Sequence, residues 1–66
     1  MTDVTEITLL GGDQVRVEGD AAQIEASILA AARGSIMEFA WFPEADSGRR
    51  VGVNPEHVVM LRRLGD

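Results

Sequence analysis

The sequence has no cysteine, no lysine and no tyrosine among its 66 residues, and only one histidine. Without cysteine, neither a disulfide framework nor a cysteine-based zinc site is available to support a small core. A domain of this size is marginal on its own, and oligomerisation is the common remedy that remains. We therefore expect one small domain, residues 1–66, that forms a homo-oligomer, with a dimer favoured. We expect no metal and no cofactor.

Long apolar runs are also missing. No segment approaches the roughly 20 apolar residues that cross a bilayer as a helix, and the first residues lack the basic start of a signal peptide. Linkers, internal repeats and low-complexity tracts are absent as well. These absences predict a cytoplasmic protein with no membrane partner.

Positive charge is scarce and unevenly placed. The formal net charge is −5, from 6 basic and 11 acidic residues, which disfavours generic binding of a nucleic-acid backbone because that binding depends on Lys and Arg. The C-terminal third nevertheless holds two arginine pairs, Arg49, Arg50, Arg62 and Arg63. This asymmetry indicates a surface for a partner.

The stretch from Asp20 to Arg33 is the one long segment with helical periodicity. Its apolar side chains form a narrow, alanine-rich stripe at helical spacing: Ala21, Ile24, Ile28, Ala31 and Ala32. Asp20, followed three residues later by Gln23, has the spacing of a capping box. Gly34 can adopt the left-handed conformation that ends a helix. We expect this helix to lie close against a sheet.

Strand patterns flank the helix on both sides. Alternating residues predict two strands before it, joined by a glycine turn, and three strands after it. A tight turn or a single 3₁₀ turn containing Pro55 separates the last two strands. The predicted strands are residues 4–10, 14–18, 35–42, 49–53 and 58–64. The expected fold is α+β, in the order β-β-α-β-β-β, with the single helix packed on a mainly antiparallel sheet of about five strands.

One helix covers only one face of such a sheet. Glu38 shares a face with the even-numbered residues of its strand, so Met37, Phe39 and Trp41 are predicted to face the helix. The opposite face would then carry more apolar surface than solvent tolerates. We predict that it mediates self-association through Leu10, Ile36, Phe42, Val58 and Met60. The rival hypothesis is a curled sheet that closes over its own second face.

No combination of residues indicates catalysis. His57 lies in a turn, and no serine has the sequence context of a catalytic nucleophile. Glu38 is the one acid within a strongly apolar strand and thus the only candidate for acid–base chemistry, but a solvent-facing or salt-bridged position, opposite Arg50 or Arg62, is the favoured interpretation. We expect a protein that is not an enzyme.

The arginine pairs are the strongest functional lead. On adjacent antiparallel strands they would project guanidinium groups to both faces, with aromatic surface added nearby. We predict a non-enzymatic binding or regulatory module that contacts a protein partner through Arg49, Arg50, Arg62, Arg63, Trp41 and Phe42. Two alternatives remain: a nucleic-acid-associated regulator that uses the same arginines, and arginines that only balance acidic charge and protect an edge strand.

The order of elements from the helix onward, with a polar turn at Gly48 and the piece Val53-Asn54-Pro55-Glu56-His57-Val58, resembles an uncharacterised actinobacterial family of small proteins. In that family, a helix also precedes a hairpin and a final strand. The Asn-Pro-x-x-Val piece is also similar to that of small flagellar FlbD-like regulators, which place such a turn between strands. Neither family has catalytic residues to carry over, and both would imply a small partner-binding protein.

Overall fold

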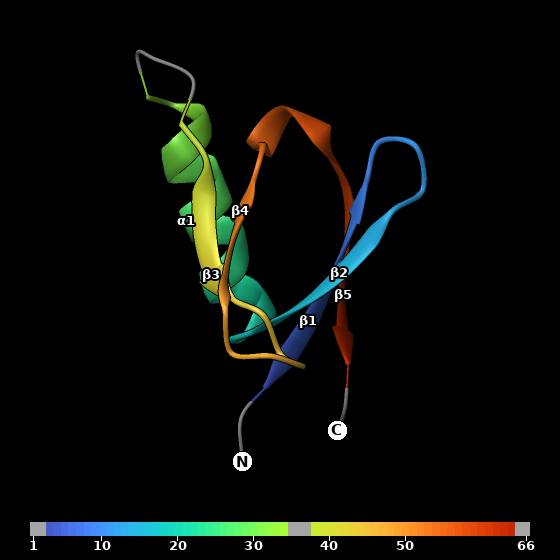
Figure 1. Cartoon of the computed structure of the whole chain (residues 1–66). Helices are drawn as coiled ribbons and strands as arrows, with labels where there is room; N and C mark the ends of the chain where they lie inside the picture. The colour runs from blue at the N-terminus through green and yellow to red at the C-terminus, as the bar shows by residue number, and fades with distance from the viewer. Residues whose placement is uncertain (1–2, 35–37, 65–66) are drawn as a thin grey trace.

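The computed structural model describes residues 3–34 and 38–64. Their elements, drawn in Figure 1, confirm the α+β class and the predicted order, with one helix and five strands in the described part. They are β1 (Val4–Leu9), β2 (Gln14–Glu18), α1 (Ala21–Ala32), β3 (Ala40–Pro43), β4 (Arg50–Val53), the 3₁₀ turn η1 (Pro55–His57) and β5 (Val58–Leu64). Every strand pairing is antiparallel.

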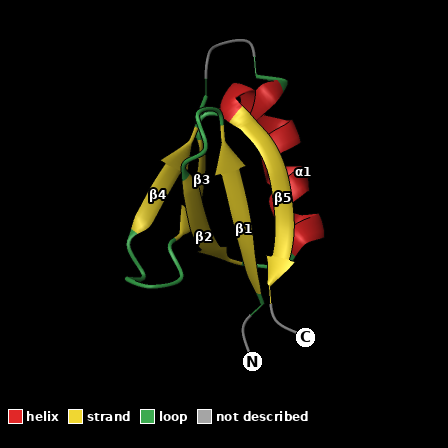
Figure 2. Cartoon of the chain, turned by 90° about the vertical axis from the view of Figure 1, so that its right-hand side faces the viewer, coloured by secondary structure: helices red, strands yellow, loops and turns green. Residues whose placement is uncertain are grey.

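The strands form two sheets, so the prediction of one sheet of about five strands is correct in number and wrong in arrangement. One sheet has the order β2-β1-β5, and the other is the hairpin β3-β4. An isolated bridge between Val17 and Glu44 joins them, supported by a hydrogen bond of 2.8 Å that the Ala45 amide donates to the Arg16 carbonyl. Figure 2 shows the result: β4 lies at one side of the molecule and β5 at the other.

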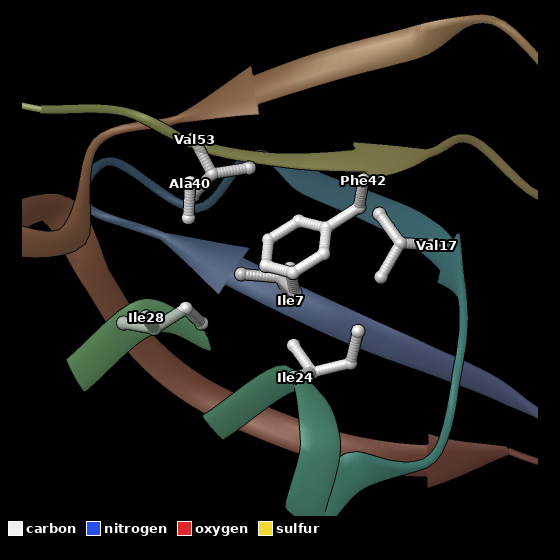
Figure 3. Packing of buried hydrophobic residues seen from close by; sticks show 7 residues of the cluster. All are labelled: Ile7, Val17, Ile24, Ile28, Ala40, Phe42 and Val53. Carbon is white, nitrogen blue, oxygen red and sulfur yellow. The ribbon is translucent and has the colours of Figure 1, made fainter. Parts of the chain in front are cut away.

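The two sheets and the helix enclose a single core. Its buried side chains come from all three parts: Ile7, Val17, Ile24, Ile28, Ala40, Phe42 and Val53 (Figure 3). The alternation of β1 and β2 explains their share, because every second side chain of a strand points to the same face. The rival hypothesis of a single sheet curled over its own second face is not observed either, because the strands form two sheets and the hairpin covers the same inner face as the helix.

The orientation of β3 is the reverse of the prediction. Ala40 and Phe42 point into the core, whereas Trp41 and Phe39 are 56% and 46% exposed. The prediction was wrong because it set the alternation from Glu38, which lies ahead of the strand and does not share its pleat. Met37 and the rest of the segment 35–37 lie outside the described residues.

The helix ends differ from the prediction in both caps. Asp20 occupies the N-cap position with an extended backbone, but its side chain makes no capping hydrogen bond. At the other end the Arg33 and Gly34 amides donate to the Leu29 and Ala31 carbonyls, and Gly34 does not take a positive φ. The exposed Glu38 side chain lies close to Gly34.

The local turns agree with the sequence. Gly11 and Gly12 both have positive φ in the β1–β2 turn, and the Asn54 side chain accepts a 2.9 Å hydrogen bond from the Glu56 amide at the start of η1. Within the described ranges, α1 is too short to span a bilayer, and no helix meets the requirements for a membrane span.

The opposite orientations of two neighbours on β3 give the first prediction. Phe42→Ala should lower the free energy of unfolding by about 3–5 kcal/mol, because it removes a ring from the core. Trp41→Ala should cost about 1 kcal/mol or less, the range of an exposed cross-strand contact. Urea denaturation followed by circular dichroism measures both changes.

A chain of this length has a total stability of about 3–10 kcal/mol, so Phe42→Ala could unfold it. Phe42→Leu, expected to cost about 1–2 kcal/mol, then keeps the comparison measurable. A greater loss from Trp41→Ala than from Phe42→Leu would contradict the observed orientation of β3.

Candidate interaction surface

The two arginine pairs do not lie on adjacent strands. Arg50 begins β4, in the two-stranded sheet, and Arg49 directly precedes it, whereas Arg62 and Arg63 lie on β5, at the edge of the other sheet. The premise of one basic patch formed by neighbouring strands is therefore wrong. All four side chains are exposed, but they lie in separate surroundings.

Arg62 belongs to a charged row on the outer face of the three-stranded sheet. In the strand register, Glu6 of β1 lies directly opposite Arg16 of β2 on one side and Arg62 of β5 on the other. Glu6 is buried, and its carboxylate oxygen Oε2 lies 3.7 Å from Arg16 Nε. Because a buried carboxylate is costly unless a cation compensates it, the first role of this row is structural.

Arg63 lies on the other face of β5, toward the helix. It lines a shallow groove between the end of β5 and the first turns of α1, together with Leu61, Asp20, Ala21, Ala22 and Glu25. Acidic groups of the helix therefore share its surroundings. This position separates Arg63 from the arginines of β4.

The residues predicted for self-association are also dispersed. Leu10 is 68% exposed in the β1–β2 turn, and Met60 is 41% exposed on the outer face of β5. Val58 packs partly against the core, and Phe42 belongs to it. Ile36 lies outside the described residues. These residues do not form the continuous apolar face that was expected.

The most distinctive exposed surface is the outer side of the β3–β4 hairpin. We call it the hairpin face and define it by Phe39, Trp41, Pro43, Arg50 and Gly52. Pro43 pairs with Arg50 and Trp41 with Gly52 in the strand register. Alternation along β3 keeps Trp41 and Pro43 exposed, and Arg50 is exposed on β4. Two of the chain's three aromatic side chains thus face solvent beside an arginine.

Gly52 allows the two rings to lie across the hairpin. A Cβ atom at Gly52 would come within 2.9 Å of Trp41 Cη2 and 3.0 Å of Phe39 Cδ2. The ring centroids of Phe39 and Trp41 are 6.4 Å apart, with planes tilted by 31°. The far end of the Trp41 ring therefore covers Gly52 and reaches toward β4. This covering is a device by which an aromatic residue protects a glycine in a strand.

The turn before β4 fixes the backbone of Arg49, next to Arg50. The Glu44 amide donates to the Arg49 carbonyl at 2.7 Å, and the Ser47 hydroxyl donates to Glu44 Oε1 at 2.7 Å and accepts from the Arg49 amide at 3.1 Å. Gly48 supplies the positive φ of 73° that this turn requires. In the described ranges, the one ion pair within 4 Å is Arg16–Glu6, so both guanidinium groups remain free for other contacts.

The remaining chemical candidates lie in open positions. Glu38 is exposed ahead of β3, and His57 is exposed in η1, as expected for a turn residue. Among residues 3–34 and 38–64, no group of three or more acidic or histidine side chains could hold a metal ion. Neither Glu38 nor His57 is held in an enclosed site.

Some residues of the hairpin face and of the Glu6 row were not predicted from the sequence. Phe39 was predicted to face the helix, and Gly52 was not considered because a glycine in a strand carries no functional signal of its own. Glu6 and Arg16 become partners only through the strand register, which the length of the glycine turn sets. That turn is the signal that could have revealed the pair.

Comparison with known proteins finds no relative of this chain: no protein-family model, no curated protein and no solved structure matches it. The resemblances described from the sequence therefore stay predictions.

The Glu6 row gives a second prediction. In a double-mutant cycle of Glu6→Gln and Arg16→Gln, we expect a coupling free energy of about 0.5–1 kcal/mol, because Arg16 is largely exposed and solvent screens the pair. Chemical denaturation at low and high salt measures it, and the coupling should fall as salt rises. Asp13→Asn, in the exposed turn, is the control. A coupling indistinguishable from zero at low salt would refute the pairing.

The single tryptophan of the chain permits a third prediction. Gly52→Ala should displace the Trp41 ring, since the added Cβ would overlap its far edge, while the fold remains intact because Gly52 has no positive φ. The Trp41 fluorescence spectrum and its quenching by acrylamide should change. Gly48 takes a positive φ with open space around its Cβ position, so Gly48→Ala should lower stability with little effect on Trp41. Identical Trp41 fluorescence in Gly52→Ala and wild type would contradict the close approach.

Proposed function

We propose that this chain is a small, non-enzymatic binding or regulatory module that self-associates and contacts a protein partner through its hairpin face. The carrying observation is the exposed pair of Phe39 and Trp41, held over Gly52 beside Arg50. Trp and Arg are the residues most enriched among those that dominate binding energy at protein interfaces. A rigid aromatic pair also loses little conformational entropy on binding.

The charges of the hairpin face favour a partner with an acidic segment. The turn fixes the backbone of Arg49 next to Arg50, the first residue of β4, and the nearby Glu44 carboxylate already accepts a hydrogen bond from Ser47. A guanidinium group binds carboxylates through paired hydrogen bonds in a fixed geometry. Arg62 and Arg63 are left out of this proposal, because they lie on the other sheet.

A nucleic-acid partner is the second candidate, since an exposed aromatic pair beside an arginine can stack on bases. The net charge of −5 and the dispersal of the arginines make it the weaker one. A mobility-shift assay with mixed DNA and RNA at low salt distinguishes the two classes, because backbone binding would weaken steeply as salt rises.

The fourth prediction concerns partner capture. Immobilised protein should retain its partners from a lysate of the source cells, and Trp41→Ser or Arg50→Glu should reduce each retained protein about tenfold or more, the effect of losing one dominant interface residue. Quantitative mass spectrometry of the retained proteins measures the reduction.

Matched controls carry the same changes elsewhere on the surface. Leu10→Ser removes an apolar group that is more exposed than Trp41, and Arg33→Glu reverses an exposed charge at the end of α1. Circular dichroism should first show that all four variants fold. If the controls reduced retention as much as the two hairpin-face variants, the hairpin face would not be the contact surface.

A further inference from the structure

The edges of the two sheets are protected unequally. The outer edge of β2 is covered at the Val17–Glu44 bridge. The register of β5 shifts beside Val59, which is 62% exposed, and Arg62 and Arg63 follow on the same strand. Bulges and charges of this kind discourage pairing with another chain. The described part of β4 pairs regularly with β3 and has no bulge and no proline, and its one charged residue is Arg50.

The exposed edge of β4 also carries complementary groups two residues apart. Arg50 and Gly52 lie on the same face of the strand, and the Trp41 ring extends over Gly52 toward this edge. A second strand placed beside β4 would therefore meet a guanidinium group at one position and an aromatic ring at the next position on that face. Each is a good partner for the other, because an aromatic face attracts a cation.

We propose that a second copy of this chain pairs along this edge, with β4 antiparallel to β4 of the copy and Val51 opposite its own equivalent. This register keeps both hairpin faces on one side of the extended sheet. It places Arg50 opposite the copy's Gly52, beneath the copy's Trp41 ring, and the two-fold axis repeats the contact in the other direction. The proposal deepens the self-association part of the proposed function and rests on it.

The neighbouring register is less favourable. Centring the axis on Gly52 would set the two Trp41 rings against each other and move Arg50 opposite Asn54, away from the rings. With Val51 at the centre, the two Arg50 side chains do not oppose each other, so like charges are kept apart. The interface is thus complementary to itself, as a two-fold contact must be.

The small size of this interface limits the affinity of the dimer. Four residues of β4 and the side chains of the hairpin face form a contact smaller than that of a stable obligate dimer. We therefore expect a dissociation constant of about 10 μM to 1 mM, and dimerisation must be measured across that range.

A disulfide test reads the register directly, because the chain has no cysteine of its own. Residues directly opposite in an antiparallel pair have Cα atoms about 4.5–5.5 Å apart, a separation that a disulfide spans. Val51→Cys should therefore oxidise to a covalent dimer, even at concentrations below the dissociation constant. The control is Val59→Cys, whose thiol is more exposed and lies on β5; it should cross-link at least about tenfold more slowly.

Sedimentation velocity of the cysteine-free protein completes the test. Arg50→Ala and Trp41→Leu should each weaken the dimer about tenfold, whereas Arg62→Ala and Leu10→Ala should leave it unchanged. A monomer at all concentrations up to 1 mM, with no preferential cross-linking of Val51→Cys, would overturn both the self-association and this register. A dimer that withstands the Arg50 and Trp41 variants, or that cross-links faster through Val59→Cys, would overturn the register alone.

Discussion

The fold depends on the burial of Phe42 between the hairpin and the three-stranded sheet. The helix supplies two buried residues, Ile24 and Ile28, which cannot by themselves cover the inner face of β1 and β2. The hairpin closes the remaining side with Phe42, Ala40 and Val53. A core of this size buries little apolar surface, so each large buried side chain accounts for a considerable part of the free energy of unfolding.

The burial of Phe42 also determines which side chains of β3 are exposed to solvent. Successive residues of a strand point to opposite faces, so an inward Phe42 requires an outward Trp41. A large exposed ring would be costly in the absence of a surface to lie on, and Gly52 provides one because it has no side chain. The hairpin face is therefore a consequence of how the core closes, and its aromatic pair is held by the backbone of β4.

The sequence predicted well those features that neighbouring residues determine. The helix, the β1–β2 turn with its two glycines and the Asn54-capped 3₁₀ turn all follow from local rules. The orientation of β3 does not, because both faces of the segment from Phe39 to Phe42 carry apolar residues and the pattern alone cannot choose between them. The division into two sheets depends on the bridge from Val17 to Glu44, a contact between residues far apart in the chain. The candidate site was predicted in part. Trp41 and Arg50 were named from the sequence, but only the pairing register of β3 and β4 shows that they lie on one face with Phe39 and Gly52.

The arrangement of the strands also limits which arginines can act together. Arg62 lies opposite the largely buried Glu6 in the strand register, on the outer face of the three-stranded sheet. Arg63 shares a groove with acidic residues of α1. Arg50 differs from both, since it lies opposite Pro43 on the hairpin face and its strand edge has no neighbour in the described chain. The two arginine pairs thus look alike in the sequence but differ in position: Arg62 lies on a strand beside a largely buried acid, whereas Arg50 lies on a strand edge that no other described strand covers.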